Sequence, residues 1–409
     1  MPSKSNPPRG NKKAKATGSK SNAPQLIATR PGQIPQWITV PVELQQLLLN
    51  IFKDTFSANF NSRYSELVQE VKQHLYNRDF DNAFGNEGLR QAYAMRWSPS
   101  RALAYANIFY NLSTLTNRLL SASRAGAGNL DHGPIHELQD ASGKTASVVT
   151  HSIEEKTSRI VCIGAGAGAE IVALGGYLNH LDRLALPMQS NIPPDGRRSE
   201  WPSQRHIGII AIDIADWDSV ACKLHSGIIT APPISQYASA NAKAANAPLI
   251  GPDTFALEFV KQDVLNMAIE QMPAIFADAT LVTLMFTLNE LYSTSMSATT
   301  NLLLSLTMLL SPGALLLVVD SPGSYSTVSI GQTSDSGDES KRKKYPMQWL
   351  LDHTLLESAA TGRSKNASGD RQWEKLESRD SQWFRLSNEL RYPIDLEDMR
   401  YQIHLYRRL

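Results

Sequence analysis

Cysteine is scarce in this sequence. Its 409 residues include only Cys162 and Cys222, too few for a disulfide framework. Neither cysteine belongs to the clustered Cys/His spacing that a structural zinc site needs. The cysteine content therefore favours a reducing compartment, and we expect no structural metal.

Long apolar runs are also missing. The most hydrophobic stretch spans residues 302–319, but Ser311, Pro312 and Gly313 interrupt it and divide it into a helix and a strand. We therefore expect no transmembrane segment and no membrane partner. Residues 1–25 contain no apolar core like that of a secretory signal, which favours an intracellular protein.

Acidic residues are absent from the first 42 positions, which hold seven lysines and arginines, although the whole chain has a formal charge of only +1. Residues 1–36 also lack periodic apolar side chains, so they bury too little surface to offset the entropy of ordering. We predict a disordered basic tail. Lys12, Lys13 and Lys15 could serve nuclear import or contact RNA phosphates, or the tail could be a solvated extension.

The hydrophobic pattern divides the remaining chain into two parts. Apolar residues at helical spacing predict an N-terminal helical unit at 37–124, and a glycine-containing polar linker follows at 125–154. One helix of this unit is predicted to begin after Ser98 as its N-cap, with Pro99 in the first helical position.

Residues 155–409 alternate between strand-like and helical segments, which is typical of a parallel sheet covered by helices. Strands are predicted at 159–163, 206–212, 255–260, 279–286 and 314–319, with a final pair around 383–386 and 400–406. The expected fold is a Rossmann-like α/β domain with five parallel strands plus a C-terminal strand pair. Surface insertions are expected near 187–204, 231–253 and 331–344.

Three alternating glycines form the strongest motif. Gly164, Gly166 and Gly168 lie between the first predicted strand and a helix that begins near Glu170. Glycines permit a tight turn and close backbone approach, and the helix N-terminus directs amide donors at an anionic or carboxylate-bearing cofactor. The spacing fits sites for S-adenosylmethionine and for dinucleotides. A tight strand–helix junction is the structural alternative.

Acidic residues follow the second and third predicted strands. Asp213 could accept hydrogen bonds from both ribose hydroxyls of a nucleoside, although Asp216 and Asp218 compete for this role. Asp213 also lies farther from the glycines than the roughly 20 positions expected in a compact unit, which the insertion at 187–204 explains. Asp263 could accept from an adenine amino group or cap a helix.

Polar residues end the fourth and fifth strands, where an open α/β sheet places its ligand crevice. Asn289 and Glu290 follow the fourth strand, with helix capping as the alternative role. Asp320 ends the fifth strand and is a candidate acid or base, or a cap of the exit turn. Tyr325 lies in the loop beyond it.

The glycine loop, the acids after strands two and three, the polar exit of strand four, the Pro-Gly turn before strand five and the terminal strand pair resemble the class I S-adenosylmethionine-dependent methyltransferases. The resemblance covers about residues 155–409 and implies S-adenosylmethionine as the cofactor. The cofactor-binding residues that it implies are Gly164, Gly166, Gly168, Asp213, Asp263 and Asn289.

One position departs from that family. Members usually have an acidic residue two positions before the first glycine, where this chain has Cys162. The contact to the methionine amine then needs a replacement, for which Glu170 or a backbone carbonyl is the candidate.

Three further segments carry a closer resemblance: residues 80–84 (FDNAF), 95–102 (MRWSPSRA) and 399–408 (MRYQIHLYRR). With them the chain resembles the fungal large-subunit ribosomal RNA uridine-N3 methyltransferases over most of its length outside the tail. This implies ribosomal RNA or a pre-ribosomal particle as partner, and the nucleus, including the nucleolus, and cytoplasm as locations. No catalytic residue is carried over.

Methylation of uridine N3 requires removal of the imide proton. Glu290, Asp320 and Tyr325 lie in the loops where an acceptor is expected. The base must be single-stranded or flipped into the pocket, where Trp97 or Tyr292 could stack on it; both are otherwise core residues.

A basic run, Lys341, Arg342, Lys343 and Lys344, follows the fifth strand on the side of the expected crevice. It is a candidate contact to RNA phosphates, and a solvated charge run or an import signal is the alternative.

Two other functions remain open from the residues alone. A nicotinamide-dependent oxidoreductase uses a similar glycine loop, but the late Asp213 and the C-terminal strand pair count against it. A catalytically inactive methyltransferase-like protein that binds RNA or a partner is the second, and Cys162 is the hint of it.

Overall fold

The computed structural model describes residues 37–112, 114–115, 158–185, 206–323, 327–330, 343–358 and 371–409. The predicted basic tail, the linker at 125–154 and the insertion at 187–204 lie outside these residues. The chain divides into two compact units, residues 1–37 and 38–409, and nearly all described residues belong to the second. The domain boundaries proposed from the sequence stay predictions.

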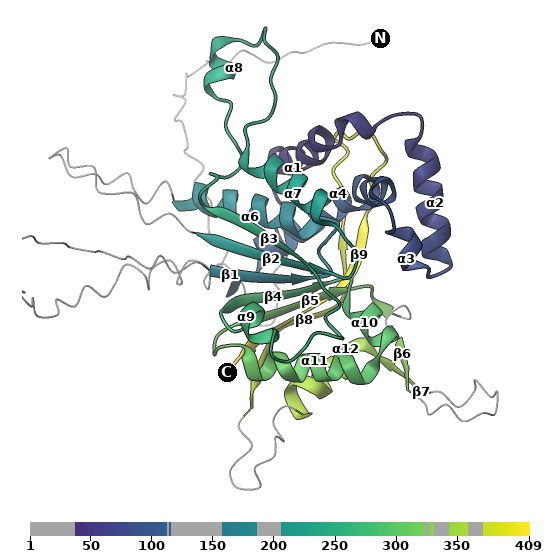
Figure 1. The fold of residues 1–409 in the computed structure, drawn as a ribbon. Coiled ribbons are helices and arrows are strands. Elements are labelled where there is room, and N and C mark those ends of the chain that lie inside the picture. Colours follow the sequence, from purple (N-terminus) through teal and green to yellow (C-terminus); the bar gives the residue numbers. More distant parts are fainter. Residues whose placement is uncertain are drawn as a thin grey trace, which may run out of the picture. The chain divides into compact units, whose positions relative to one another are not determined.

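A seven-stranded sheet forms the centre of the second unit (Figure 1). Its strands are β1 (Ser158–Ile163), β2 (Ile207–Asp213), β3 (Phe255–Lys261), β4 (Ala279–Met285), β5 (Leu315–Asp320), β8 (Trp373–Phe384) and β9 (Met399–Arg408). They are ordered β3-β2-β1-β4-β5-β9-β8. Strands β1 to β5 are parallel, and β9 is antiparallel to both β5 and β8. The predicted fold class is therefore confirmed.

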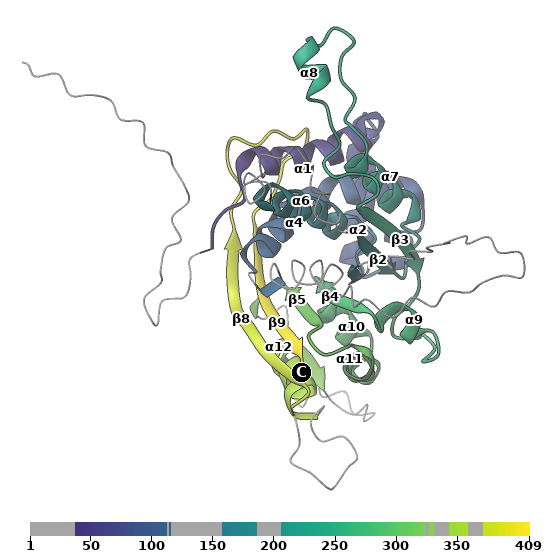
Figure 2. The same cartoon turned by 90° about the vertical axis from the view of Figure 1, so that its left-hand side faces the viewer.

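Helices cover both faces of the sheet (Figures 1 and 2). On one face lie α1 (Val42–Thr55), α4 (Glu87–Asn111), α6 (Ala169–Ala185) and α7 (Asp218–Ile229). On the other lie α9 (Met272–Phe276), α10 (Leu288–Thr294), α11 (Met296–Leu309) and α12 (Met347–Asp352), which a π-helix (His353–Ser358) continues. This double cover explains why the central strands are apolar runs: all six residues of β5 are buried, as expected for parallel strands.

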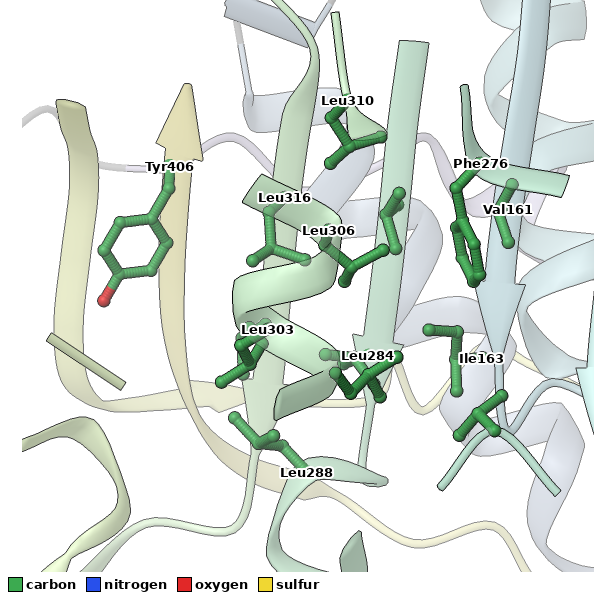
Figure 3. Close-up of a cluster of buried hydrophobic side chains, with 14 of the residues drawn as sticks. Val161, Ile163, Phe276, Leu284, Leu288, Leu303, Leu306, Leu310, Leu316 and Tyr406 are labelled. Carbon is green, nitrogen blue, oxygen red and sulfur yellow. The ribbon is translucent and has the colours of Figure 1, made fainter. Parts of the chain in front are cut away.

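A hydrophobic cluster lies between the sheet and the second group of helices (Figure 3). Val161 and Ile163 of β1, Leu284 of β4 and Leu316 of β5 are buried in this cluster, to which helices α9 and α11 also contribute. Burying a side chain of this size contributes about 1.5–3 kcal/mol, so this layer holds β1, β4 and β5 in place. The carboxyl ends of these three strands are thereby fixed relative to one another.

Helix α4 corrects the prediction that a helix begins at Ser98. It starts at Glu87, where the side chain of Asn86 accepts a hydrogen bond from the Leu89 amide, and Pro99 lies in its interior. A proline there leaves the carbonyl four residues earlier without its helical donor. The carbonyl of Met95 instead accepts from the hydroxyl of Tyr392 at 3.3 Å, which explains how the helix continues through Pro99.

The helical unit also contains α2 (Tyr64–Tyr76), α3 (Phe80–Ala83) and a short 3-10 helix, Ser57–Asn59. The connection between β8 and β9 returns to this unit. Gln46 of α1 and Arg391 exchange two hydrogen bonds of 2.8 and 2.9 Å. Arg96 of α4 pairs with Glu397, so residues on both sides of Pro393 are tied to the N-terminal helices.

Two strand predictions were incomplete. Strand β8 was expected around 383–386 but runs over Trp373–Phe384, because most of its residues are only partly buried and its apolar alternation is weak. A hairpin of β6 (Thr327–Ile330) and β7 (Lys343–Pro346) was not predicted, so the expected insertion at 331–344 ends inside β7. The insertion at 231–253 holds a short helix, α8 (Ala240–Ala244).

Candidate active site

A pocket of about 1050 Å³ lies at the carboxyl ends of the five parallel strands. Its sheet side is lined by residues at or just after each strand end: Gly164, Asp213, Asp263, Phe286, Thr287, Asn289, Glu290 and Asp320. Its other wall comes from the helical unit: Arg78, Phe80, Phe84, Arg90, Tyr93, Trp97 and Arg101. Strand order reverses between β1 and β4, which is where open α/β sheets bind ligands.

Gly164 begins the turn after β1 and lines the pocket. Its φ of +80° belongs to the left-handed region, which side chains other than glycine adopt at a cost. A Cβ atom at this position would lie 2.3 Å from Oγ1 of Thr287. The turn therefore requires glycine both for its backbone and for the space above it.

Gly166 and Gly168 are buried and do not line the pocket. A Cβ atom would lie 2.2 Å from Cδ1 of Trp217 at Gly166, and 2.2 Å from Cδ1 of Leu224 at Gly168. Both glycines thus allow the loop to pack closely against residues 217–224. This packing is the role expected if the motif is a tight strand–helix junction. The spacing of the glycines alone could not distinguish such packing from contact with a cofactor.

The helical unit supports this loop directly. Ser98 Oγ of α4 donates to the carbonyl of Ala167 at 2.7 Å. Helix α4 therefore builds one wall of the pocket and also holds the loop behind it. A capping role was predicted for Ser98 because a partner 69 positions away cannot be recognised from local sequence.

Asp213 lies at the end of β2 beside the glycine loop. Its Oδ2 accepts from the Gly166 amide and its Oδ1 from the Ala215 amide, both at 3.1 Å. Burial raises the pKa of this carboxyl to about 6, although these hydrogen bonds oppose the shift. A half-buried carboxylate that lines the pocket retains lone pairs for ribose hydroxyls. Asp216 lines the pocket from an exposed position, and Asp218 does not line it.

Asp263 also lines the pocket, but both of its oxygens are engaged by its own loop. Oδ1 accepts from the Leu265 amide at 2.9 Å, and Oδ2 accepts from Asn266 Nδ2 at 2.6 Å. These contacts close a turn at residues 264–266, because no helix begins there as the capping alternative expected. The predicted adenine contact depends on the lone pairs that remain.

Asn289 and Asp320 act as a pair at the ends of β4 and β5. Asp320 Oδ1 accepts from Asn289 Nδ2 at 2.8 Å, and Oδ2 accepts from the Asn289 amide at 3.0 Å. Asp320 Oδ1 also accepts from the Ser321 amide at 2.8 Å. Burial raises the pKa of Asp320 to about 6. The side chain that holds the start of α10 is Asp320, and not Asn289 or Glu290, the residues that the capping alternative named. Both Asp320 and Asn289 line the pocket.

Glu290 is the most exposed of the predicted catalytic residues that the structure describes. Its carboxylate accepts from Arg78 Nη2 at 2.6 Å, and the two side chains are 49% and 59% exposed. Such an exposed ion pair contributes little to stability, about 0–1 kcal/mol. It does join the strand side of the pocket to the helical wall.

Glu170 does not replace the acid that is missing at position 162. Its carboxyl is 2% exposed, does not line the pocket, and accepts from Oγ1 of Thr283 at 2.6 Å. Cys162 lies beside Thr283 in the sheet and is fully buried. The expectation that Glu170 reaches the cofactor is wrong, because the start of helix α6 directs its side chain onto β4 instead of into the pocket.

Burial raises the pKa of Glu170 to about 8 from an ordinary value of 4.5, which predicts a pH effect on stability. Because the folded state holds this proton more tightly, the contribution is complete below pH 4.5 and is lost as pH rises to about 8. Glu170→Gln removes this titration. We expect the variant to gain stability relative to the wild type, by roughly a few kcal/mol, between pH 5 and pH 8.

Chemical denaturation at the two pH values measures this change. Glu66→Gln, at an exposed position of α2, is the matched control and should show no such divergence. Parallel pH profiles for the wild type and Glu170→Gln would show that Glu170 is already ionised in the folded protein.

The structure distinguishes the two aromatic candidates for base stacking. Trp97 lines the pocket, and its ring centroid lies 4.9 Å from that of Tyr93. Tyr292 is 2% exposed and belongs to the hydrophobic cluster, so its stacking role is wrong and its core role holds. Tyr93 and Arg101 were not predicted. Both lie in or beside the segment 95–102, whose helical period did not reveal which face meets the pocket.

Several predicted residues cannot be placed. Tyr325, Lys341 and Arg342 lie outside the described residues. Lys343 and Lys344 belong to β7, where they are paired with Ile330 and Ser329.

Among the residues that the structure describes, no group of three or more His, Cys, Asp and Glu side chains is arranged to hold a metal ion. No helix in those residues is long and apolar enough to span a membrane.

The pocket suits a cofactor that combines a nucleoside with a charged amino-acid part. Gly164 permits close approach at the end of β1, and the Asp213 carboxylate is available beside it. Oδ1 of Asn289 is buried and has no hydrogen-bond partner among the described residues. Buried polar atoms are normally satisfied, so this atom points to a missing partner. With the sheet order, these features define a class I methyltransferase architecture.

Comparison with known proteins identifies the family. A family model described as "Putative SAM-dependent methyltransferase" matches residues 52–407, and the chain belongs to this family. S-adenosylmethionine is therefore the cofactor, as predicted, and the nicotinamide alternative is not supported. A curated relative from Saccharomyces cerevisiae, the 25S rRNA (uridine(2843)-N(3))-methyltransferase, is 31% identical over 369 residues. The alignment covers 88% of this chain and 85% of the relative.

Solved structures give weaker similarities. A SAM-dependent methyltransferase from Methanosarcina mazei is 10% identical with a TM-score of 0.31, covering 62% of this chain and 93% of that protein. The N-methyltransferase NodS from Bradyrhizobium japonicum, in complex with S-adenosyl-L-homocysteine, is 11% identical with a TM-score of 0.28. It covers 61% of this chain and 78% of NodS.

Proposed function

We propose that this protein methylates N3 of a uridine in large-subunit ribosomal RNA. The observation that carries the proposal is the similarity to the Saccharomyces cerevisiae enzyme, which extends over 88% of this chain. It is not confined to the cofactor domain, so it includes most of the helical unit that forms the second pocket wall. A location in the nucleus and cytoplasm belongs to the same proposal.

The size and lining of the pocket support a nucleobase as substrate. Small-molecule sites commonly enclose about 300–1000 Å³, and the pocket of about 1050 Å³ has room for a base beside a cofactor. Phe80, Phe84, Tyr93 and Trp97 line its helical wall. Aromatic rings stack on unpaired bases, which suits a uridine that is single-stranded or flipped out of its helix.

S-adenosylmethionine supplies a methyl group on a positively charged sulfur, and an in-line displacement transfers it to the acceptor nitrogen. The chain must align this acceptor, exclude water and accept the N3 proton. Glu290 and Asp320 both line the pocket. Glu290 is the more accessible acceptor. Asp320 already receives three hydrogen bonds, so its first effect is to orient Asn289.

Nucleoside analysis tests the proposed reaction. The purified protein is incubated with labelled S-adenosylmethionine and protein-free large-subunit rRNA from cells that lack the endogenous enzyme. Mass spectrometry of the digested RNA should then show 3-methyluridine, and fragments covering the rRNA would locate it. Transfer to another nucleoside, or none to this rRNA despite cofactor binding, would contradict the proposed substrate. Small-subunit rRNA is the control.

The basic run after β5 is proposed as an RNA contact. Replacing Lys341, Arg342, Lys343 and Lys344 by Ala should weaken rRNA binding and leave cofactor binding unchanged. The logarithmic salt dependence of RNA affinity should fall by up to about four phosphate contacts. Affinities measured across a salt series check this expectation.

A matched variant separates the contribution of residues 341–344 from that of the N-terminal tail. Replacing Lys4, Lys12, Lys13 and Lys15 by Ala removes the same number of positive charges at the N-terminus. A reduced slope in the tail variant alone would assign the phosphate contacts to the tail. An unchanged slope in the variant of residues 341–344 would contradict their RNA role.

A further inference from the structure

Arg101 is a positive charge in the pocket that the proposed function has not used. It belongs to helix α4 and lines the pocket together with Gly164, Phe286 and Asp320. Its Nη1 donates to the hydroxyl of Tyr93 at 2.6 Å. The guanidinium carbon lies 5.7 Å from the centroid of the Tyr93 ring and 5.5 Å from that of Phe286.

The guanidinium has no carboxylate partner among the described residues. Arginine stays protonated and presents five N–H donors, of which the Tyr93 hydroxyl accepts one. Asp320 acts on Arg101 electrostatically, but hydrogen bonds from Asn289 and Ser321 already hold its carboxylate.

The remaining ionisable neighbours do not neutralise this charge. Tyr93 and Tyr105 share helix α4 with Arg101, and burial raises the pKa of Tyr105 above its ordinary value. Glu170 of α6, on the same face of the sheet, interacts with Arg101 electrostatically, and its raised pKa of about 8 keeps it protonated at neutral pH. Arg101 is half-buried and lines the pocket, so its remaining N–H groups are available to an acceptor on a ligand that enters the pocket.

We propose that Arg101 forms an oxyanion-binding subsite of this pocket. Two sources supply an oxyanion there, namely the carboxylate at the amino-acid end of the cofactor and a carbonyl oxygen of an ionised uracil. The second source rests on the proposed function. A planar guanidinium matches either acceptor, because its N–H groups can donate two parallel hydrogen bonds to oxygen.

A contact between Arg101 and the cofactor carboxylate compensates for the acid that is missing at position 162. Cys162 replaces the acid that usually contacts the methionine amine, and it is fully buried. Glu170 does not line the pocket. A chain without that acid can fix the amino-acid end through its carboxylate instead, and Arg101 lies in the same pocket as Gly164.

The uracil oxygen gives Arg101 a catalytic effect. Removal of the N3 proton leaves negative charge shared between the nitrogen and the two neighbouring carbonyl oxygens. A nearby guanidinium favours the ionised form and lowers the pKa of the imide. The proton then leaves to a pocket carboxylate or water, and N3 keeps the electron pair that forms the new bond to carbon.

Calorimetry with two ligands tests the first source. S-adenosylhomocysteine carries the carboxylate, whereas 5′-methylthioadenosine lacks the whole amino-acid end. If Arg101 binds the carboxylate, Arg101→Gln weakens S-adenosylhomocysteine binding about tenfold or more and leaves methylthioadenosine binding unchanged. Arg101→Lys should recover part of the loss.

A pH–rate profile tests the second source. With cofactor and RNA saturating, Arg101→Gln should move the rise in methylation rate to higher pH by about one unit or more, while S-adenosylhomocysteine affinity stays unchanged. Arg159→Gln is the matched control, since Arg159 lies at the start of β1 and donates to the Ala274 carbonyl. It should behave as the wild type in both assays.

Either selective effect supports the oxyanion subsite and identifies its source. Equal weakening of both ligands with a lowered melting temperature, or no change in either assay, would overturn it. These results remain separate from a failure of the proposed function. That failure would appear as absence of 3-methyluridine with the wild-type protein.

Discussion

Gly164→Ala is expected to abolish binding of S-adenosylhomocysteine and to destabilise the fold by roughly 3 kcal/mol or more. The new Cβ atom would meet Thr287 Oγ1 at 2.3 Å, and the residue would have to keep a φ of +80°. Thr287 Oγ1 donates to the Ile163 carbonyl at 3.1 Å, so it cannot move without loss of that bond. Calorimetry and chemical denaturation measure the two effects.

Gly323→Ala is the matched control for backbone strain. Gly323 has a φ of +73°, but nothing lies within 4 Å of a Cβ atom built there. The control should lose only about 1–2 kcal/mol and keep cofactor binding. Equal losses in the two variants would mean that Thr287 gives way and that strain alone accounts for the need for glycine at position 164.

Asp213→Asn should weaken S-adenosylhomocysteine binding by about 1–3 kcal/mol, because the charge-assisted hydrogen bonds to the ribose are lost. In the wild type the affinity should rise as pH increases through about 6, since Asp213 is protonated below its raised pKa. The variant has no such titration. Calorimetry from pH 5 to pH 8 should therefore show a slope only in the wild type.

Asp320→Asn controls for the second pocket carboxyl, whose pKa is also about 6. If Asp213 holds the ribose, this variant keeps the pH dependence of cofactor affinity. Loss of the slope in Asp320→Asn, with the slope retained in Asp213→Asn, would transfer the cofactor contact from β2 to β5.

The sheet and its crevice could be predicted because they depend on local patterns. Buried parallel strands are continuous apolar runs, and residues at strand ends such as Asp213 and Asp320 must gather at one edge. The apolar patterns of these segments are strong enough to be recognised in a single sequence. Family resemblance then supplied the cofactor.

The helical wall could not be predicted because its roles depend on partners far away in the sequence. Pro99 indicates a helix start until the Tyr392 hydroxyl is known to satisfy the Met95 carbonyl. Arg101 resembles any helical arginine until Tyr93 and Phe286 are placed beside it. For Gly166 and Gly168 the error was the opposite one. Their place in a binding motif predicted contact with the cofactor, and their packing against Trp217 and Leu224 could not be predicted.

The return of the β8–β9 connection to the N-terminal helices has a consequence for synthesis of the protein. Gln46 bonds to Arg391, and Ser100 to Glu397, across 345 and 297 positions of sequence. A ribosome must therefore make nearly all of the described chain before α1 and α4 gain these contacts and the Met95 carbonyl gains its hydrogen bond from Tyr392. Contacts so distant in sequence form slowly. The pocket is thus a late product of folding, and a nascent chain that already contains the glycine loop still lacks part of the wall that closes it.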